Sequence, residues 1–158
     1  MDPLPLAPAL QVSRWFNADP TLTLESLRGR VVMLHSFQML CPGCVTHAIP
    51  QAVKVHEMFD PREVSVIGLH TVFEHHPVMN AAALEVFIHE YRLRFPIAID
   101  RAAAGDDTDD DVPQTMRTYG FKGTPSLVLL DKLGQIRVNH FGRIDDLALG
   151  AMIGRLLT

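Results

Sequence analysis

Cysteine is scarce in this sequence. Only two occur in 158 residues, and they stand three positions apart, as Cys41 and Cys44. Without a third cysteine, a zinc ion held by this pair would need two histidines, of which His47 is the nearest in sequence. A static disulfide between the two would close too short a loop to constrain the unfolded chain much. The C-x-x-C spacing favours a redox-active pair over both alternatives.

Long apolar runs and clusters of basic residues are also missing. No apolar run approaches the ~20 residues of a membrane span, and 14 Lys and Arg against 18 Asp and Glu give a net charge of −4. We therefore expect neither a membrane nor a nucleic-acid partner. Residues 1–10 carry Asp2 and three prolines, unlike a signal peptide. Unless a leader has been trimmed, this predicts a cytoplasmic protein whose cysteines cycle rather than stay oxidised.

The remaining composition is that of an ordinary globular protein. Hydrophobic residues make up 47% and charged residues 20% of the chain. The length suffices for one domain with its own core. We expect residues 1–14 to form an extended, proline-rich lead-in and residues 15–158 to form a single domain.

Hydrophobic patterning predicts alternating strands and helices. Strands are expected at 30–37, 64–69, 95–100, 126–131 and 135–141, the last two as a hairpin. Helices are expected at 42–59, 78–94, 113–119 and 146–157, with a short strand and one helical turn over 21–29. The order predicts an α/β fold, with a central mixed β-sheet flanked by helices on both faces.

Three details of the helices can be predicted as well. Pro50 lies inside the first long helix and should kink it. Asp145 should cap the last helix. The helix at 78–94 should turn one apolar face to the core, comprising Met79, Ala82, Ala83, Val86, Phe87 and Tyr91.

The cysteine pair falls where the strand at 30–37 gives way to the helix that follows. Unpaired N–H groups and the helix dipole stabilise an anion in the first turn of a helix. A cysteine there has a lowered pKa and therefore more of the nucleophilic thiolate. Pro42 suits this turn because it has no N–H to lose, and Gly43 leaves no side-chain bulk between the two sulfurs.

A second chemical landmark is Gly123-Thr124-Pro125, directly before an apolar strand. Proline cannot donate to a strand ladder, so its place here needs a reason. Together with the C-x-x-C pair, it favours a cis peptide between Thr124 and Pro125. The Thr124 N–H and C=O would then be free to pair with a substrate peptide.

These two motifs together resemble the thioredoxin fold. The stretches 24–32 and 129–136 further resemble its redoxin branch, the TlpA-like thiol-disulfide oxidoreductases and their peroxiredoxin relatives, and the resemblance runs from about residue 15 to the end. It implies that Cys41 attacks, that Cys44 resolves the mixed disulfide, and that Pro125 lies against the pair. Thr124, Pro42 and Gly43 would contact the substrate.

The same resemblance implies how the protein works with its partners. No cofactor is expected beyond the redox-active disulfide itself. The expected partners are proteins carrying disulfides or dithiols, with peroxide as an alternative, and the expected state is a monomer or weak dimer.

Several residues depart from the family pattern. Leu40 replaces the tryptophan of thioredoxins, and His35 stands where relatives commonly have Asp or Asn. A buried His35 could relay a proton to or from Cys44, and the alternative is an ordinary core histidine. Glu74 is a second candidate proton acceptor.

Two further departures invite metal-site interpretations, but we expect no metal. A cluster of His70, His75 and His76 could hold a metal, although exposed loop histidines are commoner. The acidic run Asp106–Asp111 lacks the glycine and glutamate of a calcium loop. A solvated loop that favours basic partner surfaces is the better interpretation.

Two other functions compete with thiol–disulfide exchange. A peroxiredoxin-like peroxidase, with antioxidant activity, would have Thr or Ser three residues before the reactive cysteine, where this chain has Gln38. A non-catalytic redox-sensing module would carry a pair that titrates but turns nothing over.

Overall fold

The structure, a computed structural model, describes residues 3–103 and 112–158. The acidic run predicted to form a solvated loop, Asp106–Asp111, lies outside the described residues.

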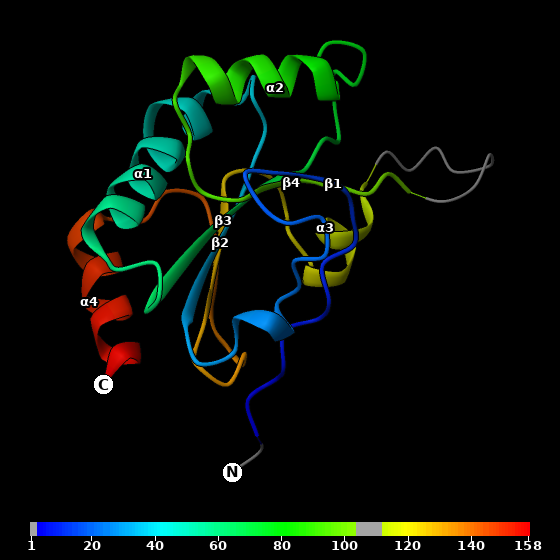
Figure 1. Cartoon of the computed structure of the whole chain (residues 1–158). Helices are drawn as coiled ribbons and strands as arrows, with labels where there is room; N and C mark the ends of the chain where they lie inside the picture. The colour runs from blue at the N-terminus through cyan, green and yellow to red at the C-terminus, as the bar shows by residue number, and fades with distance from the viewer. Residues whose placement is uncertain (1–2, 104–111) are drawn as a thin grey trace.

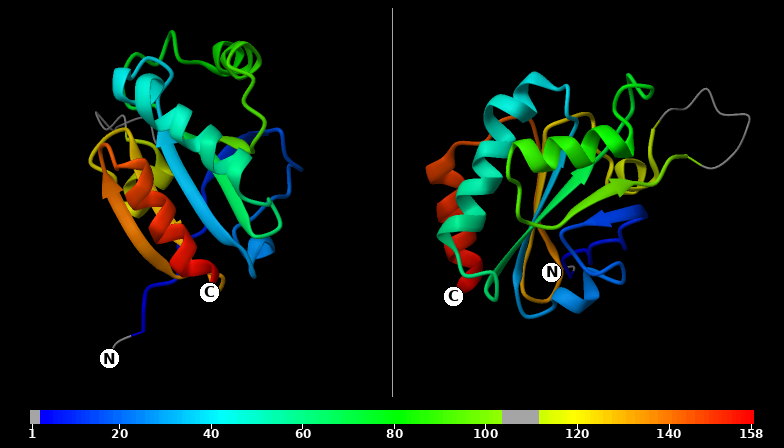
Figure 2. Two further views of the ribbon diagram at one scale, coloured as in Figure 1. Left: turned by 90° about the vertical axis from the view of Figure 1, so that its left-hand side faces the viewer. Right: turned by 45° about the horizontal axis from the view of Figure 1, so that its top comes forward.

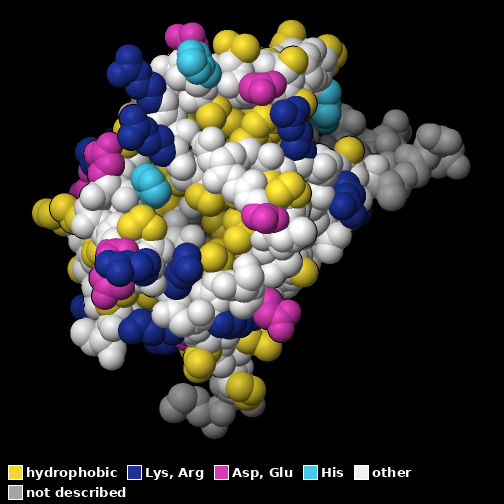
Figure 3. Space-filling view, in the orientation of Figure 1, with side chains coloured by type: hydrophobic (Ala, Val, Ile, Leu, Met, Phe, Trp, Pro, Cys, Tyr) yellow, Lys and Arg dark blue, Asp and Glu magenta, His cyan; other side chains and the backbone are white. Residues whose placement is uncertain are grey.

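Among the described residues, none of the helices combines the length and the apolar character that crossing a membrane requires. On the described part of the face in Figure 3, Lys and Arg side chains are interspersed with Asp and Glu.

A six-stranded mixed sheet runs through the molecule in the order β1-β4-β3-β2-β5-β6 (Figure 1). The central strand β2 pairs in parallel with β3 and antiparallel with β5, while β3 and β4 are parallel. The edge strands β1 and β6 are antiparallel to β4 and β5. This confirms the predicted α/β fold. The strands are β1 (Val12–Phe16), β2 (Val31–Phe37), β3 (Val64–His70), β4 (Ile97–Asp100), β5 (Ser126–Leu130) and β6 (Ile136–Phe141).

The central strands are apolar because both of their faces are covered. Every residue of β2, β3 and β5 is buried, as expected for strands between two helical layers. Alternate residues of β2 enter different clusters: Val31 and Met33 belong to one, Val32 and Leu34 to the other. Helices α1 (Ile49–Met58), α2 (Ala81–Glu90) and α4 (Asp146–Leu157) contribute to the first cluster, and α3 (Gln114–Tyr119) to the second (Figure 2).

The helix after the cysteines changes its winding before Pro50. A π-helical turn covers Cys44–Ala48, and α1 follows with Pro50 in its first turn. Pro50 has no N–H to donate to the carbonyl four residues earlier, and a π-turn is a common way to accommodate such a gap. A short π-helical turn thus lies directly before the proline that was expected to kink the helix.

The N-terminal segment is more integrated than expected. Strand β1 pairs with β4, so the boundary we placed between residues 14 and 15 falls inside a strand. Upstream, Leu6 forms a bridge with Gln135, and the Tyr119 hydroxyl donates to the Pro8 carbonyl at 2.6 Å.

Two predicted elements were wrong in extent. Residues 21–24 form no strand; only a 3₁₀ turn, η1 (Glu25–Leu27), occurs in that region. The helix expected at 78–94 is the shorter α2, capped by the Asn80 side chain. Its buried helical residues, Leu84 and Ile88, were not in the predicted face. Three residues of that face do meet the core: Met79 is buried just before the helix, and Ala83 and Phe87 pack against the core cluster.

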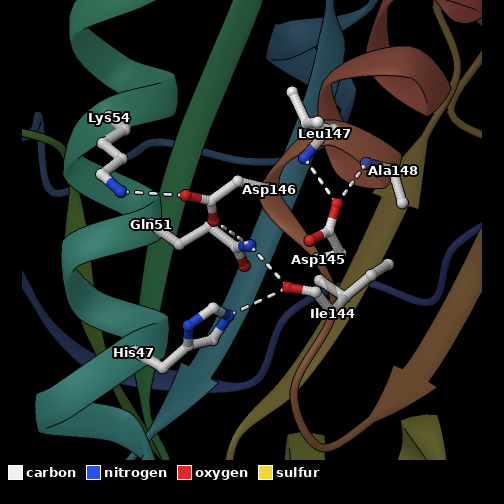
Figure 4. A network of polar contacts seen from close by, with 8 residues as sticks. All are labelled: His47, Gln51, Lys54, Ile144, Asp145, Asp146, Leu147 and Ala148. Atoms are coloured by element: carbon white, nitrogen blue, oxygen red, sulfur yellow. Dashed lines mark hydrogen bonds and ion pairs between the residues drawn. The ribbon is translucent and has the colours of Figure 1, made fainter.

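A polar network fastens α1 to the start of α4 (Figure 4). Gln51 Nε2 donates to the Ile144 carbonyl at 2.9 Å and to Asp146 Oδ1 at 2.8 Å. His47 Nε2 lies 2.9 Å from the same carbonyl, and Lys54 pairs with Asp146 at 2.9 Å. The Asp145 carboxylate accepts bonds from the first N–H groups of α4, as predicted for its cap.

We predict that Asp145→Ala lowers the free energy of unfolding by about 1 kcal/mol, because two N–H groups at the start of α4 lose their acceptor. Urea unfolding followed by circular dichroism measures this. Asp145→Asn, which keeps an acceptor oxygen, should stay close to the parent. Equal losses in both variants would show that the cap is not the cause.

Candidate active site

The two predicted motifs meet where strand β2 ends and its neighbour β5 begins. In the β2–β5 pair, Ser36 lies opposite Ser126, so the chain leaving β2 passes the chain entering β5. The Cys41 Sγ lies 3.5 Å from the Thr124 carbonyl oxygen as a result. The Thr124–Pro125 peptide is cis, as predicted.

Pro125 lies directly over the turn between the two cysteines. A Cβ atom added at Gly43 would stand 3.5 Å from Pro125 Cδ, at ordinary van der Waals distance. A larger side chain at Gly43 would therefore reach the proline. The structure thus places Pro125 beside the residue between the two cysteines, and its contact with the two sulfurs stays a prediction.

The two cysteines are free thiols in different surroundings. Cys41 is partly exposed, whereas Cys44 is completely buried in the core beside β2. The backbone N–H groups of Cys44 and Val45 both donate to the Cys41 carbonyl at 3.1 Å, which places Cys41 just ahead of the helix. Only Cys41 can meet a sulfur atom from outside.

These surroundings move the two thiol pKa values in opposite directions. Partial burial acts to raise the pKa of Cys41, but hydrogen bonds from Cys44, Thr124 and the backbone of Cys44 and Gly43 outweigh it and leave that pKa lowered. Burial, with the hydrogen bond to Cys41, raises the pKa of Cys44 to about 12. Because the thiolate is the nucleophile, the site activates Cys41 and keeps Cys44 protonated.

The Gln38 side chain links two loops near Cys41. The sequence did not predict this role. The side chain is buried, and its Oε1 accepts a bond from the Phe73 N–H at 3.2 Å. Its Nε2 lies 3.4 Å from both Glu74 Oε1 and Thr124 Oγ1. The only signal in the sequence was a polar residue between an apolar strand and the cysteine pair.

A groove of about 570 Å³ opens beside Cys41. Three of its side chains are large, apolar and more than half exposed: Leu40, Val78 and Phe141. The groove thus offers an exposed apolar surface beside the reactive sulfur. Its lining comprises Leu40, Cys41, Pro42, Phe73, Glu74, His75, Val78, Gly123, Thr124 and Phe141.

His35 is buried in β2 and stacks on Phe37, with ring centroids 5.3 Å apart. Burial lowers its pKa to about 3, so the ring is neutral at ordinary pH. Its Nε2 has no hydrogen-bond partner among the described residues. His35 shares the face of β2 that carries Phe37, and the cluster there includes Cys44.

The other histidines considered as metal ligands do not converge. His70 is the last residue of β3 rather than a loop residue, and its buried Nε2 accepts a bond from the Met39 N–H at 3.2 Å. His75 and His76 are exposed, and His47 is engaged with α4. Within residues 3–103 and 112–158, no group of three or more His, Cys, Asp or Glu side chains is placed to hold a metal ion.

Comparisons with known proteins agree with this geometry. The family model of Redoxin matches residues 7–146. A thiol-disulfide isomerase from Corynebacterium glutamicum is 49% identical over all of this chain and 99% of its own, with a TM-score of 0.92. A thioredoxin-like superfamily protein is 50% identical over 96% of each chain, with a TM-score of 0.90.

A curated relative is much longer. Protein DipZ of Mycobacterium bovis is 29% identical over an alignment of 159 positions that covers 96% of this chain. The chain spans only 20% of the length of DipZ. Since the Redoxin model covers most of the chain and the fold is thioredoxin-like, this protein belongs to the Redoxin family.

Proposed function

We propose that the protein is a thiol-disulfide oxidoreductase in which Cys41 attacks and Cys44 resolves. The observation that carries this is the contrast between the two thiols: Cys41 is accessible with a lowered pKa, and Cys44 is buried with its pKa raised to about 12. Family membership and the likeness to the C. glutamicum thiol-disulfide isomerase support the same activity.

The exchange proceeds in two displacements. The Cys41 thiolate attacks one sulfur of a substrate disulfide, forming a mixed disulfide, and the other substrate sulfur leaves as a thiolate and takes a proton. The Cys44 thiol then loses its proton and attacks Cys41 Sγ, which releases the second substrate thiolate. Two electrons pass from the dithiol to the substrate, and Cys41 and Cys44 end as a disulfide.

The substrate binds in the groove beside Cys41. The Thr124 backbone pairs with an extended peptide, while Pro42 and Gly43 leave room for it above the helix start. Protein disulfides or dithiols fit this surface because exposed apolar side chains line the groove beside the sulfur. That the protein needs no cofactor, acts as a monomer or weak dimer and resides in the cytoplasm stays a prediction.

The resolving step needs a proton acceptor for Cys44. His35 is the first candidate, because its neutral ring faces the same core cluster as Cys44 and has an open Nε2. Glu74 is the second, since it borders the groove at Cys41 and is linked to Gln38. His35 is a weak base because burial lowers its pKa, so it would receive the proton only transiently.

The Gln38 amide argues against a peroxidase. The Gln38 side-chain nitrogen donates hydrogen bonds to Glu74 and Thr124, and the side-chain oxygen accepts one from the Phe73 N–H. No donor remains on this side chain to polarise a bound peroxide, which is the task of the Thr or Ser that peroxiredoxins have there. Antioxidant activity through peroxide reduction is therefore the weaker candidate.

We predict that the protein catalyses insulin reduction by dithiothreitol, that Cys41→Ser lowers the rate to the uncatalysed background, and that Cys44→Ser accumulates a mixed disulfide. Turbidity follows insulin reduction, and mass spectrometry identifies the trapped adduct. Peroxide consumption is measured in parallel. Rapid peroxide loss with inert insulin would support the peroxidase instead, and inertness in both assays would leave the pair without a catalytic role.

We predict that iodoacetamide alkylates Cys41 with a pH midpoint below that of an ordinary cysteine, while Cys44 stays unreacted well above neutral pH. In Cys44→Ala the midpoint for Cys41 should move up, because the hydrogen bond that stabilises its thiolate is gone. Peptide mapping assigns each alkylated site. First reaction at Cys44, or an unchanged midpoint in the variant, would contradict the assigned roles.

We predict that His35→Leu slows resolution of the mixed disulfide by about 10²-fold, the lower end of the range for general acid–base catalysis. Rapid-quench trapping of the adduct measures this step. In the Cys44→Ser background, which lacks the resolving thiol, only the first attack by Cys41 is observed. There, His35→Leu should leave the rate of attack unchanged. An unchanged resolution rate in His35→Leu would eliminate His35 and leave Glu74 as the candidate.

A further inference from the structure

Gln38, three residues before Cys41, is polar and almost wholly buried. Its exposed fraction is 1%. Burying an amide costs free energy unless its hydrogen bonds are formed, and here both ends of the amide are engaged. Its partners lie far away in sequence, 35 residues on at Phe73, 36 at Glu74 and 86 at Thr124.

These partners belong to two different loops that both line the Cys41 groove. Phe73 and Glu74 belong to the loop after β3, and Thr124 belongs to the loop before β5. Gln38 is on the segment that connects β2 to Cys41. Its side chain is a direct polar link between these two loops, which we call the two walls of the groove.

We propose that Gln38 is a positioning residue that sets the width of the Cys41 groove and thereby selects extended peptide disulfides over small disulfides. This inference rests on the proposed oxidoreductase function and goes further by naming what determines its substrate class. A small disulfide needs only access to Cys41 Sγ. An extended peptide must also contact both walls, so it alone depends on their spacing.

The direct test is Gln38→Met, which keeps the length of the side chain and removes its hydrogen bonds. Three partner groups then lose a bond, and the walls are free to separate. We expect KM for insulin to rise about 10-fold, which corresponds to the net contribution of about one hydrogen bond, with a smaller change in kcat. The rate with hydroxyethyl disulfide should change less than the insulin KM, because the Gln38 side chain bonds to neither cysteine sulfur.

Gln51→Met is the matched control. Gln51 is also buried, at 4% exposure, and its amide also bonds to residues more than 90 positions away. It belongs to α1, however, and its amide links α1 to the start of α4 (Figure 4). This variant should lower stability without changing the ratio of insulin to hydroxyethyl disulfide activity. A change in that ratio confined to Gln38→Met separates substrate selection from general loss of structure.

A second variant tests the link from its exposed end. Glu74→Ala removes one partner of Gln38 from an exposed position, so the fold should tolerate it. It should raise KM for insulin about threefold, and adding Gln38→Met should cost less than the product of the two single effects, because the bond between the residues is already lost. If Gln38→Met does not fold, Gln38→Glu, which keeps an acceptor oxygen for the Phe73 N–H and removes the amide donors, is compared by the same two-substrate ratio.

The outcomes separate this inference from the function on which it rests. If the parent protein reduces neither substrate, the proposed function fails and the inference with it. If the parent is active but Gln38→Met keeps its insulin KM, or loses both activities equally, only the inference is overturned. A raised insulin KM with a smaller change in hydroxyethyl disulfide reduction supports it.

Discussion

The antiparallel pairing of β2 with β5 is the constraint on which the site depends. The two strands are hydrogen-bonded from Val32 to Ser36, with Ser36 opposite Ser126. This register brings Cys41 to 3.5 Å from the Thr124 carbonyl, although 83 residues separate them. Because both strands are buried on both faces, a one-residue slip would turn core side chains the wrong way. The packing of the core therefore fixes the distance between the Cys41 thiol and the loop that contains Thr124.

Two cysteines three residues apart acquire different chemistry from their positions at the start of one helix. Cys41 lies ahead of the first turn, within reach of N–H groups and of the groove, while Cys44 turns into the core. Neither thiol is special in isolation, and the difference comes from burial and hydrogen bonding. The same burial that protects Cys44 from outside reagents also makes its deprotonation costly, so the second displacement is the step that needs help from a base.

Much of the fold follows from local sequence, and the rest does not. The buried strands β2, β3 and β5 can be predicted from their apolar runs. The cap of α4 can be predicted because Asp145 is a favoured N-cap residue directly before the helix. Strand β1 was missed because it is a short, half-exposed edge strand whose pairing with β4 is entirely long-range. The buried face of α2 was misjudged because Val86 and Tyr91, apolar in type, are exposed. The Gln38 contacts were invisible because all three partners are distant in sequence.

The central claim is that Cys41 and Cys44 act as one two-electron couple. Equilibration of the protein in dithiothreitol redox buffers, followed by acid quench, alkylation and mass spectrometry, tests this directly. The account predicts only two species at every potential, the dithiol and the internal Cys41–Cys44 disulfide, with a Nernst slope for two electrons. Independent oxidation of the two thiols, or disulfides formed only between molecules, would contradict it.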